Sequence, residues 1–194
     1  MFIKIHFSTN AKRVLSCYFY NILELLAVKT SFFNNLLLGW RQPVFINEIK
    51  MSKITSKDKV LLIGCGIFPS ETIVIAQETN AQVVGIDNAP NVVKIAKKYI
   101  KKIGLSHLIR IKYADGVDFD VKEFDVIFIA INVFPINNVL KHLSKKLKKG
   151  TRIMCKSIKH DIPLVLKTEK MEDIFKIIGK LENPKTQSYL LIKK

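Results

Sequence analysis

Two short motifs carry the residue types best suited to chemistry. Gly64 and Gly66 flank Cys65 directly after the apolar run 60–63, and Asp87 ends a second apolar run that begins at residue 81. A strand, a Gly-x-Gly turn, a helix and an acid about 20 residues further on are typical of the nucleoside-binding half of an α/β fold. We expect the glycines to permit close approach of the backbone to a ligand and Asp87 to accept hydrogen bonds from ribose hydroxyls. The pattern favours a cofactor-dependent enzyme.

Each of these residues also has a purely structural interpretation. A Gly-x-Gly sequence after a strand occurs at ordinary turns, and an Asp just before a helix often caps that helix. A nicotinamide-dinucleotide site would need a third glycine where Pro69 stands. Cys65 is more readily explained as a small packing residue than as a nucleophile.

Alternating strands and helices after residue 56 must position the two motifs. We expect strands at about 59–63, 82–87, 108–113, 124–131 and 151–156, separated by helices at about 70–79, 90–104 and 136–148. Ser70 is the expected cap of the first of these helices. After a short helix at about 163–172, the turn-like residues 183–186 between 174–182 and 188–193 predict a C-terminal β-hairpin. One longer helix over 168–181 is the alternative, because its isoleucines also fit helical spacing.

Residues 1–55 differ from the rest of the chain. Apolar residues dominate 14–28 and again 32–40, and a helix that is apolar nearly all round must be buried or lie on something apolar. We therefore predict an N-terminal helical cap over 1–55 and a second domain over 56–194, with Pro43 and the polar stretch 50–58 marking the junction. A substrate lid, a homodimer contact and a membrane-surface contact are all compatible with these helices. Glu24, Trp40 and Arg41 could reach a substrate from this segment.

The chain is strongly basic, with a formal net charge of +16. Such a charge suits a nucleic-acid or anionic-membrane partner, but lysines solvated on helix faces explain it equally simply. Two clusters show the simpler interpretation, since they fall at helical spacing opposite apolar residues: Lys94, Lys97, Lys98, Lys101 and Lys102, and then Lys141, Lys145, Lys146, Lys148 and Lys149.

Cysteines and histidines form no recognisable framework. Cys17, Cys65 and Cys155 are scattered without a CxxC pair, and the four histidines lack metal-ligand spacing. We predict reduced thiols, no bound metal and a cytoplasmic location. The most apolar stretch, 14–28, is interrupted by Ser16, Asn21 and Glu24, so no membrane-spanning segment is expected.

Residues 57–193 resemble the class I S-adenosylmethionine-dependent methyltransferases. The resemblance lies in the glycine turn 60–66, the acid-bearing strand 83–87, the segment 111–116 (IKYADG) and the fourth strand 124–130 (FDVIFIA). It implies an α/β, Rossmann-like sheet, mostly parallel with a C-terminal antiparallel hairpin, behind an N-terminal helical extension.

The same resemblance implies the positions that bind S-adenosylmethionine. Gly64 and Gly66 would face its methionine part, Asp87 would bind the ribose diol, and Asp115 would accept from the adenine amino group. The implied cofactor-binding residues are Gly64, Cys65, Gly66, Asp87, Asn88, Ala114, Asp115, Gly116 and Ala130. The segment 131–133 would line the reaction side, while the catalytic residues are unknown. Asp115 and Gly116 could also form a plain turn.

Two departures from the methyltransferase pattern point to a narrower resemblance. Leu62 stands where an acid is common, and Phe68-Pro69 follows the glycines in place of a third glycine. The loop 63–76 is similar to that of nicotianamine synthases, which share the fold but transfer the aminocarboxypropyl group of S-adenosylmethionine. Their helical extension before the core is also similar.

The sequence as a whole predicts a cytoplasmic S-adenosylmethionine-dependent methyltransferase with an unidentified acceptor, either a small molecule or RNA. Aminocarboxypropyl transfer is the alternative reaction. A non-catalytic basic RNA-binding module that retains the fold is the alternative from a different class, and a steep salt dependence of RNA affinity would support it.

Overall fold

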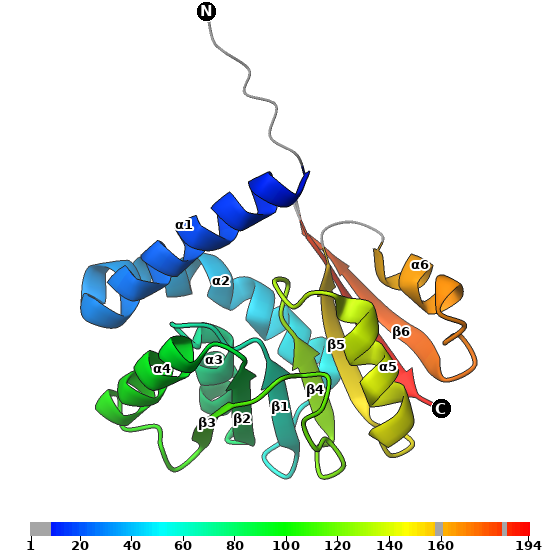
Figure 1. The fold of residues 1–194 in the computed structure, drawn as a ribbon. Coiled ribbons are helices and arrows are strands. Elements are labelled where there is room, and N and C mark those ends of the chain that lie inside the picture. Colours follow the sequence, from blue (N-terminus) through cyan, green and yellow to red (C-terminus); the bar gives the residue numbers. More distant parts are fainter. Residues whose placement is uncertain (1–8, 158–160, 184–185) are drawn as a thin grey trace, which may run out of the picture.

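A computed structural model describes residues 9–157, 161–183 and 186–194, with side chains from residue 19 onward except that of residue 161 (Figure 1). Its centre is a seven-stranded sheet in the order β3-β2-β1-β4-β5-β7-β6. The strands are β1 (Lys59–Ile63), β2 (Gln82–Asp87), β3 (Ile109–Tyr113), β4 (Val126–Ile129), β5 (Arg152–Ser157), β6 (Phe175–Glu182) and β7 (Gln187–Lys193). Strands β1 to β5 are parallel, whereas β7 is antiparallel to both β5 and β6. The predicted mixed sheet with a C-terminal antiparallel pair is confirmed.

Helices cover both faces of this sheet. They are α1 (Thr9–Lys29), α2 (Ser31–Ser52), α3 (Ser70–Thr79), α4 (Pro90–Lys102), α5 (Ile136–Lys146) and α6 (Asp161–Thr168). Side chains alternate between the faces of a strand, so Leu62 of β1 packs with α2, α3 and α4, whereas Leu61 packs with α5 and α6. Two apolar clusters, one on each face, form the core, and Figure 1 shows the α1–α2 hairpin lying across the top of the first layer.

The α1–α2 hairpin is fastened to the core through α2. Leu37, Phe45 and Ile49 are buried in the same cluster as α3 and α4. At the end of α2, Arg152 of β5 donates from Nη1 to the carbonyl oxygens of Ser52 at 2.6 Å and Lys53 at 2.7 Å. The segment predicted as a cap is therefore helical over 9–52 and shares its apolar core with the sheet.

Several local predictions are wrong. Pro43 lies inside α2 and does not mark a junction, and the helix runs on to Ser52. Ser70 is the first residue of α3 after the N-cap Pro69, so it does not cap that helix. The strand predicted at 124–131 spans only Val126–Ile129. Turns at its two ends limit it, because the amide of Phe124 donates to the carbonyl of Val121 and the amide of Val133 to that of Ala130.

The C-terminal pair settles the ambiguity over 168–181. Phe175–Glu182 pairs with β7 along its length, with one register shift between Ile177 and Gly179, so this segment is a strand and the longer helix is excluded. The turn predicted at 183–186 includes residues 184 and 185, which lie outside the described residues.

Candidate functional site

A cleft of about 1,100 Å³ opens between the carboxyl ends of the central strands and the α1–α2 hairpin. Strand β1 lies between β2 on one side and β4 on the other, so chain connections diverge at this point of the sheet. Ligands of open α/β sheets bind at such a divergence, outside the carboxyl ends of the strands. The cleft is lined by every residue that the sequence predicts for cofactor binding: Gly64, Cys65, Gly66, Asp87, Asn88, Ala114, Asp115, Gly116 and Ala130.

The glycine turn has a backbone that side chains would disturb. Gly64 has a φ of +82° and Gly66 a φ of +72°, both in the left-handed region. A Cβ on Gly64 would lie 2.7 Å from Val133 Cγ2, and a Cβ on Gly66 would lie 2.8 Å from Glu24 Oε2. The amides of Gly64 and Cys65 both donate to the carbonyl of Ile86, at 2.9 and 3.0 Å. The turn is thus held against β2, with an open surface facing the cleft.

Asp87 joins the two motifs that the sequence singles out. Its Oδ2 accepts from the backbone amide of Gly66 and its Oδ1 from that of Ala89, each at 3.1 Å. Burial raises the pKa of the Asp87 carboxyl, and these two hydrogen bonds oppose that rise because they favour the charged form. The N-cap of α4 is Ala89, without a side-chain capping bond, so Asp87 does not occupy the cap position. Each carboxylate oxygen has further acceptor capacity for a ligand hydroxyl.

The segment after β3 forms the neighbouring wall. The amide of Ala114 donates to the carbonyl of Asp87 at 3.2 Å, which places this segment beside the ribose-binding candidate. Asp115 Oδ1 accepts from the amide of Val117 at 3.1 Å, so it does stabilise a turn, and it also borders the cleft. A Cβ on Gly116 would lie 2.6 Å from Ile63 Cγ2, so this position packs directly on β1. The adenine contact of Asp115 stays a prediction.

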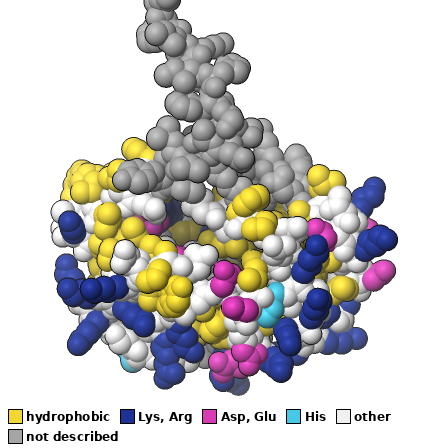
Figure 2. Space-filling view, in the orientation of Figure 1, with side chains coloured by type: hydrophobic (Ala, Val, Ile, Leu, Met, Phe, Trp, Pro, Cys, Tyr) yellow, Lys and Arg dark blue, Asp and Glu magenta, His cyan; other side chains and the backbone are white. Residues whose placement is uncertain are grey.

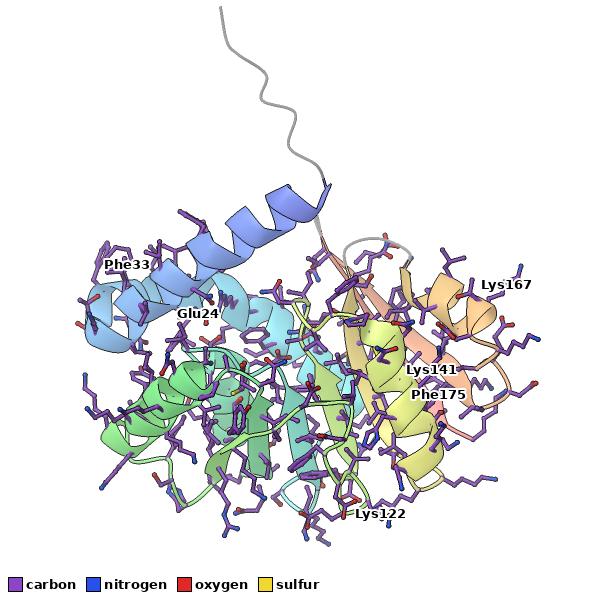
Figure 3. All side chains as sticks on the ribbon, viewed as in Figure 1. Glu24, Phe33, Lys122, Lys141, Lys167 and Phe175 are labelled. Carbon is purple, nitrogen blue, oxygen red and sulfur yellow. The ribbon has the colours of Figure 1, made fainter. Side chains whose placement is uncertain are left out.

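The hairpin closes the cleft through a contact that the sequence alone does not place. Glu24 of α1 points down to the glycine loop (Figure 3), where its Oε2 accepts from the amides of Ile67 at 3.0 Å and Phe68 at 3.3 Å. Its Oε1 forms an ion pair with Arg41 Nη1 at 3.0 Å. Arg41 also donates to Ser70 Oγ at 3.3 Å. Trp40 borders the same cleft, so all three residues suspected in the N-terminal segment reach it.

A buried charged cluster on the cleft wall is missed by sequence reasoning. Lys156 Nζ of β5 lies 3.0 Å from Glu48 Oε2 and 2.7 Å from Glu71 Oε1. Burial raises the pKa of Glu71 to about 7, although the attraction of Lys156 opposes this. Burial acts against the charged form of Lys156, but the two carboxylates outweigh it and raise the lysine's pKa. No signal in a single sequence brings together one residue each from α2, α3 and β5.

Asp125, just before β4, lies at the other end of the sheet. It accepts from the amide of Lys59 at 2.9 Å and from Lys148 Nζ at 2.6 Å. Burial acts to raise the pKa of Asp125, but these hydrogen bonds lower it overall. Its role is structural.

Two kinds of site are not found in the described part of the chain. Residues 9–157, 161–183 and 186–194 hold no group of three or more His, Cys, Asp or Glu side chains placed to bind a metal ion. Within the same ranges, no helix has both the length and the apolar character needed to span a bilayer. Cys65 and Cys155 are buried free thiols, and burial raises the pKa of both.

Comparison with known proteins gives matches of two kinds. The family model described as nicotianamine synthase protein matches residues 21–183. A curated relative, demethylmenaquinone methyltransferase from Bacillus cytotoxicus, is 23% identical over 144 residues, which cover 70% of this chain. The chain spans only 60% of that relative's length.

Solved structures share the fold. MtNAS, as a point mutant in complex with S-adenosylmethionine, superimposes with a TM-score of 0.76 at 17% identity, over 93% of this chain and 76% of that one. An RNA methyltransferase from Salinibacter ruber, in complex with S-adenosyl-L-homocysteine, superimposes with a TM-score of 0.64 at 19% identity, over 78% of this chain and 92% of that one.

Proposed function

The chain belongs to the nicotianamine synthase family, and on that premise we propose that it is an S-adenosylmethionine-dependent transferase. The observation that carries the proposal is the link between the two motifs: Asp87 accepts from the amide of Gly66 at the carboxyl ends of β1 and β2, inside the large cleft. This link holds a carboxylate beside a turn of the kind that ligands approach closely, which supports a role for Asp87 in binding ribose.

The residues present fit the cofactor. Gly64, Gly66 and Asp87 all border the cleft, and Asp87 retains acceptor capacity for a diol. We assign the ribose to Asp87 and the adenine edge to the segment 114–116. The methionine part would then lie towards the glycine turn and the hairpin. When bound, S-adenosylmethionine supplies an activated sulfonium, so that the residues around the cleft chiefly position the acceptor and exclude water.

Methyl transfer is the first candidate reaction. The fold is that of the class I methyltransferases, and the curated relative is named as a methyltransferase. Aminocarboxypropyl transfer is the second candidate, favoured by the family match over residues 21–183 and by the contact of Glu24 with the glycine loop. The acceptor in either reaction would be a small molecule or RNA.

Calorimetric titration with S-adenosylmethionine tests the cofactor site. We expect saturable binding by the intact protein and its loss in Asp87→Ala. The control is Asp118→Ala, which removes an exposed acid that does not border the cleft. Absence of binding by folded, ligand-free protein would overturn the proposal and favour the non-catalytic RNA-binding alternative.

Product analysis separates the two reactions. Methyl transfer releases S-adenosylhomocysteine, and aminocarboxypropyl transfer releases methylthioadenosine, so an acceptor screen read by product identity decides between them. A cytoplasmic location is part of the proposal, supported by the buried free thiols Cys65 and Cys155. The homodimer through the N-terminal helices stays a prediction.

A further inference from the structure

The α1–α2 hairpin exposes several large apolar side chains to solvent. On α2, Phe32, Leu36 and Trp40 recur every fourth residue and are 71%, 45% and 76% exposed. A four-residue spacing places side chains along one face of a helix. On α1, Phe19 and Ile22 are also exposed, at 60% and 45%. We call these five residues the hairpin face. Scattered exposed apolar residues need no explanation, but a stripe of this kind marks an interaction surface.

Exposed lysines lie beside the hairpin face. The side chain of Asn34 donates to Tyr99 Oη, which fastens the start of α2 to α4. Around Tyr99, helix α4 exposes Lys94, Lys97, Lys98, Lys101 and Lys102. Figure 2 shows hydrophobic side chains over the hairpin at the upper left and Lys and Arg side chains below them, over α4. The stripe and the lysines are thus presented on one side of the molecule.

This side of the molecule has almost no negative charge. Residues 9–52 contain only two acids, Glu24 and Glu48, and residues 88–102 contain none. Glu24 is turned to the glycine loop and Glu48 is fully buried against Lys156. Between residues 30 and 49 the only cation is Arg41, which pairs with Glu24. The apolar ridge of α2 is therefore uncharged, and the cations are set back at its edge.

We propose that the hairpin face docks on the surface of an anionic lipid membrane. The apolar stripe would enter the boundary between headgroups and acyl chains, and the α4 lysines would meet the lipid phosphates. A formal net charge of +16 for the whole chain adds to this attraction. Trp40 and Tyr20 also border the cleft, so docking would hold the mouth of the cleft at the lipid surface.

Two other occupants fit the surface less well. A second copy of the chain would bring another strongly basic protein onto this surface, and residues 88–102 offer no acids to offset that repulsion. A protein surface that binds single-stranded RNA combines aromatic side chains, on which bases stack, with cations that contact the backbone. On the hairpin face, Leu36 and Ile22 interrupt the aromatic residues, and the sequence has no cation between Phe32 and Trp40.

Trp40 is the only tryptophan in the chain, so it reports on docking without any substitution. We expect its emission to shift to the blue with vesicles of equimolar phosphatidylglycerol and phosphatidylcholine, and lipids brominated on their acyl chains to quench it. Pure phosphatidylcholine vesicles should give a much smaller shift. An unchanged emission with anionic vesicles at low salt would overturn the proposal.

Vesicle co-sedimentation of variants identifies the surface. Phe32→Ser combined with Leu36→Ser, and separately Lys98→Glu combined with Lys101→Glu, should each weaken binding by about tenfold or more. The matched controls are Ile178→Ser on β6, which also replaces an exposed apolar residue, and Lys145→Glu combined with Lys146→Glu on α5. Equal losses in variants and controls would overturn the assignment to the hairpin.

RNA binding and dimerisation through the hairpin face would give results different from those of membrane docking. Tight binding of polyuridine without vesicle binding would replace the membrane by RNA. A dimer in light scattering that Phe32→Ser with Leu36→Ser converts to monomer, again without vesicle binding, would replace it by a second copy. All of these measurements are independent of S-adenosylmethionine, so their failure leaves the proposed transferase untouched.

Discussion

Glu71 is a carboxylic acid whose acid–base chemistry is changed by its surroundings. It lies in the first turn of α3, is buried beside the cleft, and shares Lys156 with Glu48. One lysine faces two carboxylates, and burial leaves the second negative charge poorly solvated. A proton on Glu71 relieves this imbalance, which is the physical reason for its raised pKa. Glu71 therefore binds its proton more tightly in the folded protein than in the unfolded chain.

We predict that stability falls as the pH rises through the neutral range. Burial raises the pKa of Glu71 from 4.5 to about 7, so between these values the folded protein holds more protons than the unfolded chain. The contribution of Glu71 to the free energy of unfolding therefore decreases from about pH 4.5 to about pH 7, by on the order of 3 kcal/mol in total, and is flat above. Glu71→Gln mimics the protonated form and should remove this decrease, in urea unfolding followed from pH 5 to pH 8.

The control for this prediction is Glu78→Gln, which changes an exposed glutamate on the same helix. It should leave the pH dependence as it is in the unmodified protein. An identical pH profile for Glu71→Gln and the unmodified protein would show that Glu71 is ionised throughout and that the cluster is fully charged.

The glycine turn gives a second prediction at this scale. Gly64 and Gly150 have nearly the same φ, +82° and +85°, but a Cβ on Gly64 would lie 2.7 Å from Val133 Cγ2, whereas a Cβ on Gly150 would meet nothing within 4 Å. Both alanine variants carry the backbone cost of a left-handed residue, about 1 kcal/mol. Gly64→Ala should cost about 1–3 kcal/mol more, because of the added contact. Thermal unfolding compares the two, and equal costs would contradict the crowding at Gly64.

At the scale of elements, Arg152 fixes how α2 lies on the sheet. Arg152 is the first residue of β5. Its guanidinium donates to the carbonyl oxygens of Ser52 and Lys53 at the end of α2 and forms an ion pair with Asp58. A cation at a helix C-terminus satisfies carbonyls that have no partner in the helix. Since α2 provides Glu48 and Arg41 to the cleft, this contact also sets the position of the hairpin above the site.

We predict that Arg152→Met destabilises the protein by about 2–4 kcal/mol, because it leaves Asp58 and the Ser52 carbonyl without their partner. Lys148→Met is the control, since it removes an exposed lysine from its pair with Asp125 and should cost at most about 1 kcal/mol. Urea unfolding at neutral pH measures both. A cost for Arg152→Met no larger than that of the control would mean that apolar packing alone holds α2.

Prediction from sequence succeeds for elements whose signal is local. The strands around the glycine turn and Asp87 are continuous apolar runs bounded by turn residues, and the structure has them within a residue of the expected ends. It fails where tertiary contacts outweigh local preference. Pro43 is exposed inside α2, so the carbonyl it leaves without a donor faces solvent, while Leu37, Phe45 and Ile49 on either side bury enough surface to keep the helix intact. The Glu48–Glu71–Lys156 cluster is formed by residues far apart in the sequence, and the periodicity of a single sequence does not predict such contacts.

For the whole molecule, the hairpin and the glycine loop form one unit through Glu24. The carboxylate accepts from two loop amides and pairs with Arg41, so it connects α1, α2 and the turn before α3. A ligand that orders the loop should therefore also order the hairpin, and the hairpin should raise affinity by holding the loop in place. A contiguous set of contacts can carry coupling of this kind, and these hydrogen bonds provide one.

We predict that S-adenosylmethionine slows amide hydrogen exchange in α1 from residue 19 to 29 as well as in the loop at Ile67 and Phe68. In Glu24→Ala the cofactor should still protect the wall at 114–117, because those residues do not contact Glu24, but protection of α1 should be lost. Glu123→Ala is the control, since it removes an exposed acid that pairs with Lys59 at the other end of the sheet. Undiminished protection of α1 in Glu24→Ala would show that the hairpin closes through its apolar packing on α3 and α4, with the carboxylate as a local brace for the loop only.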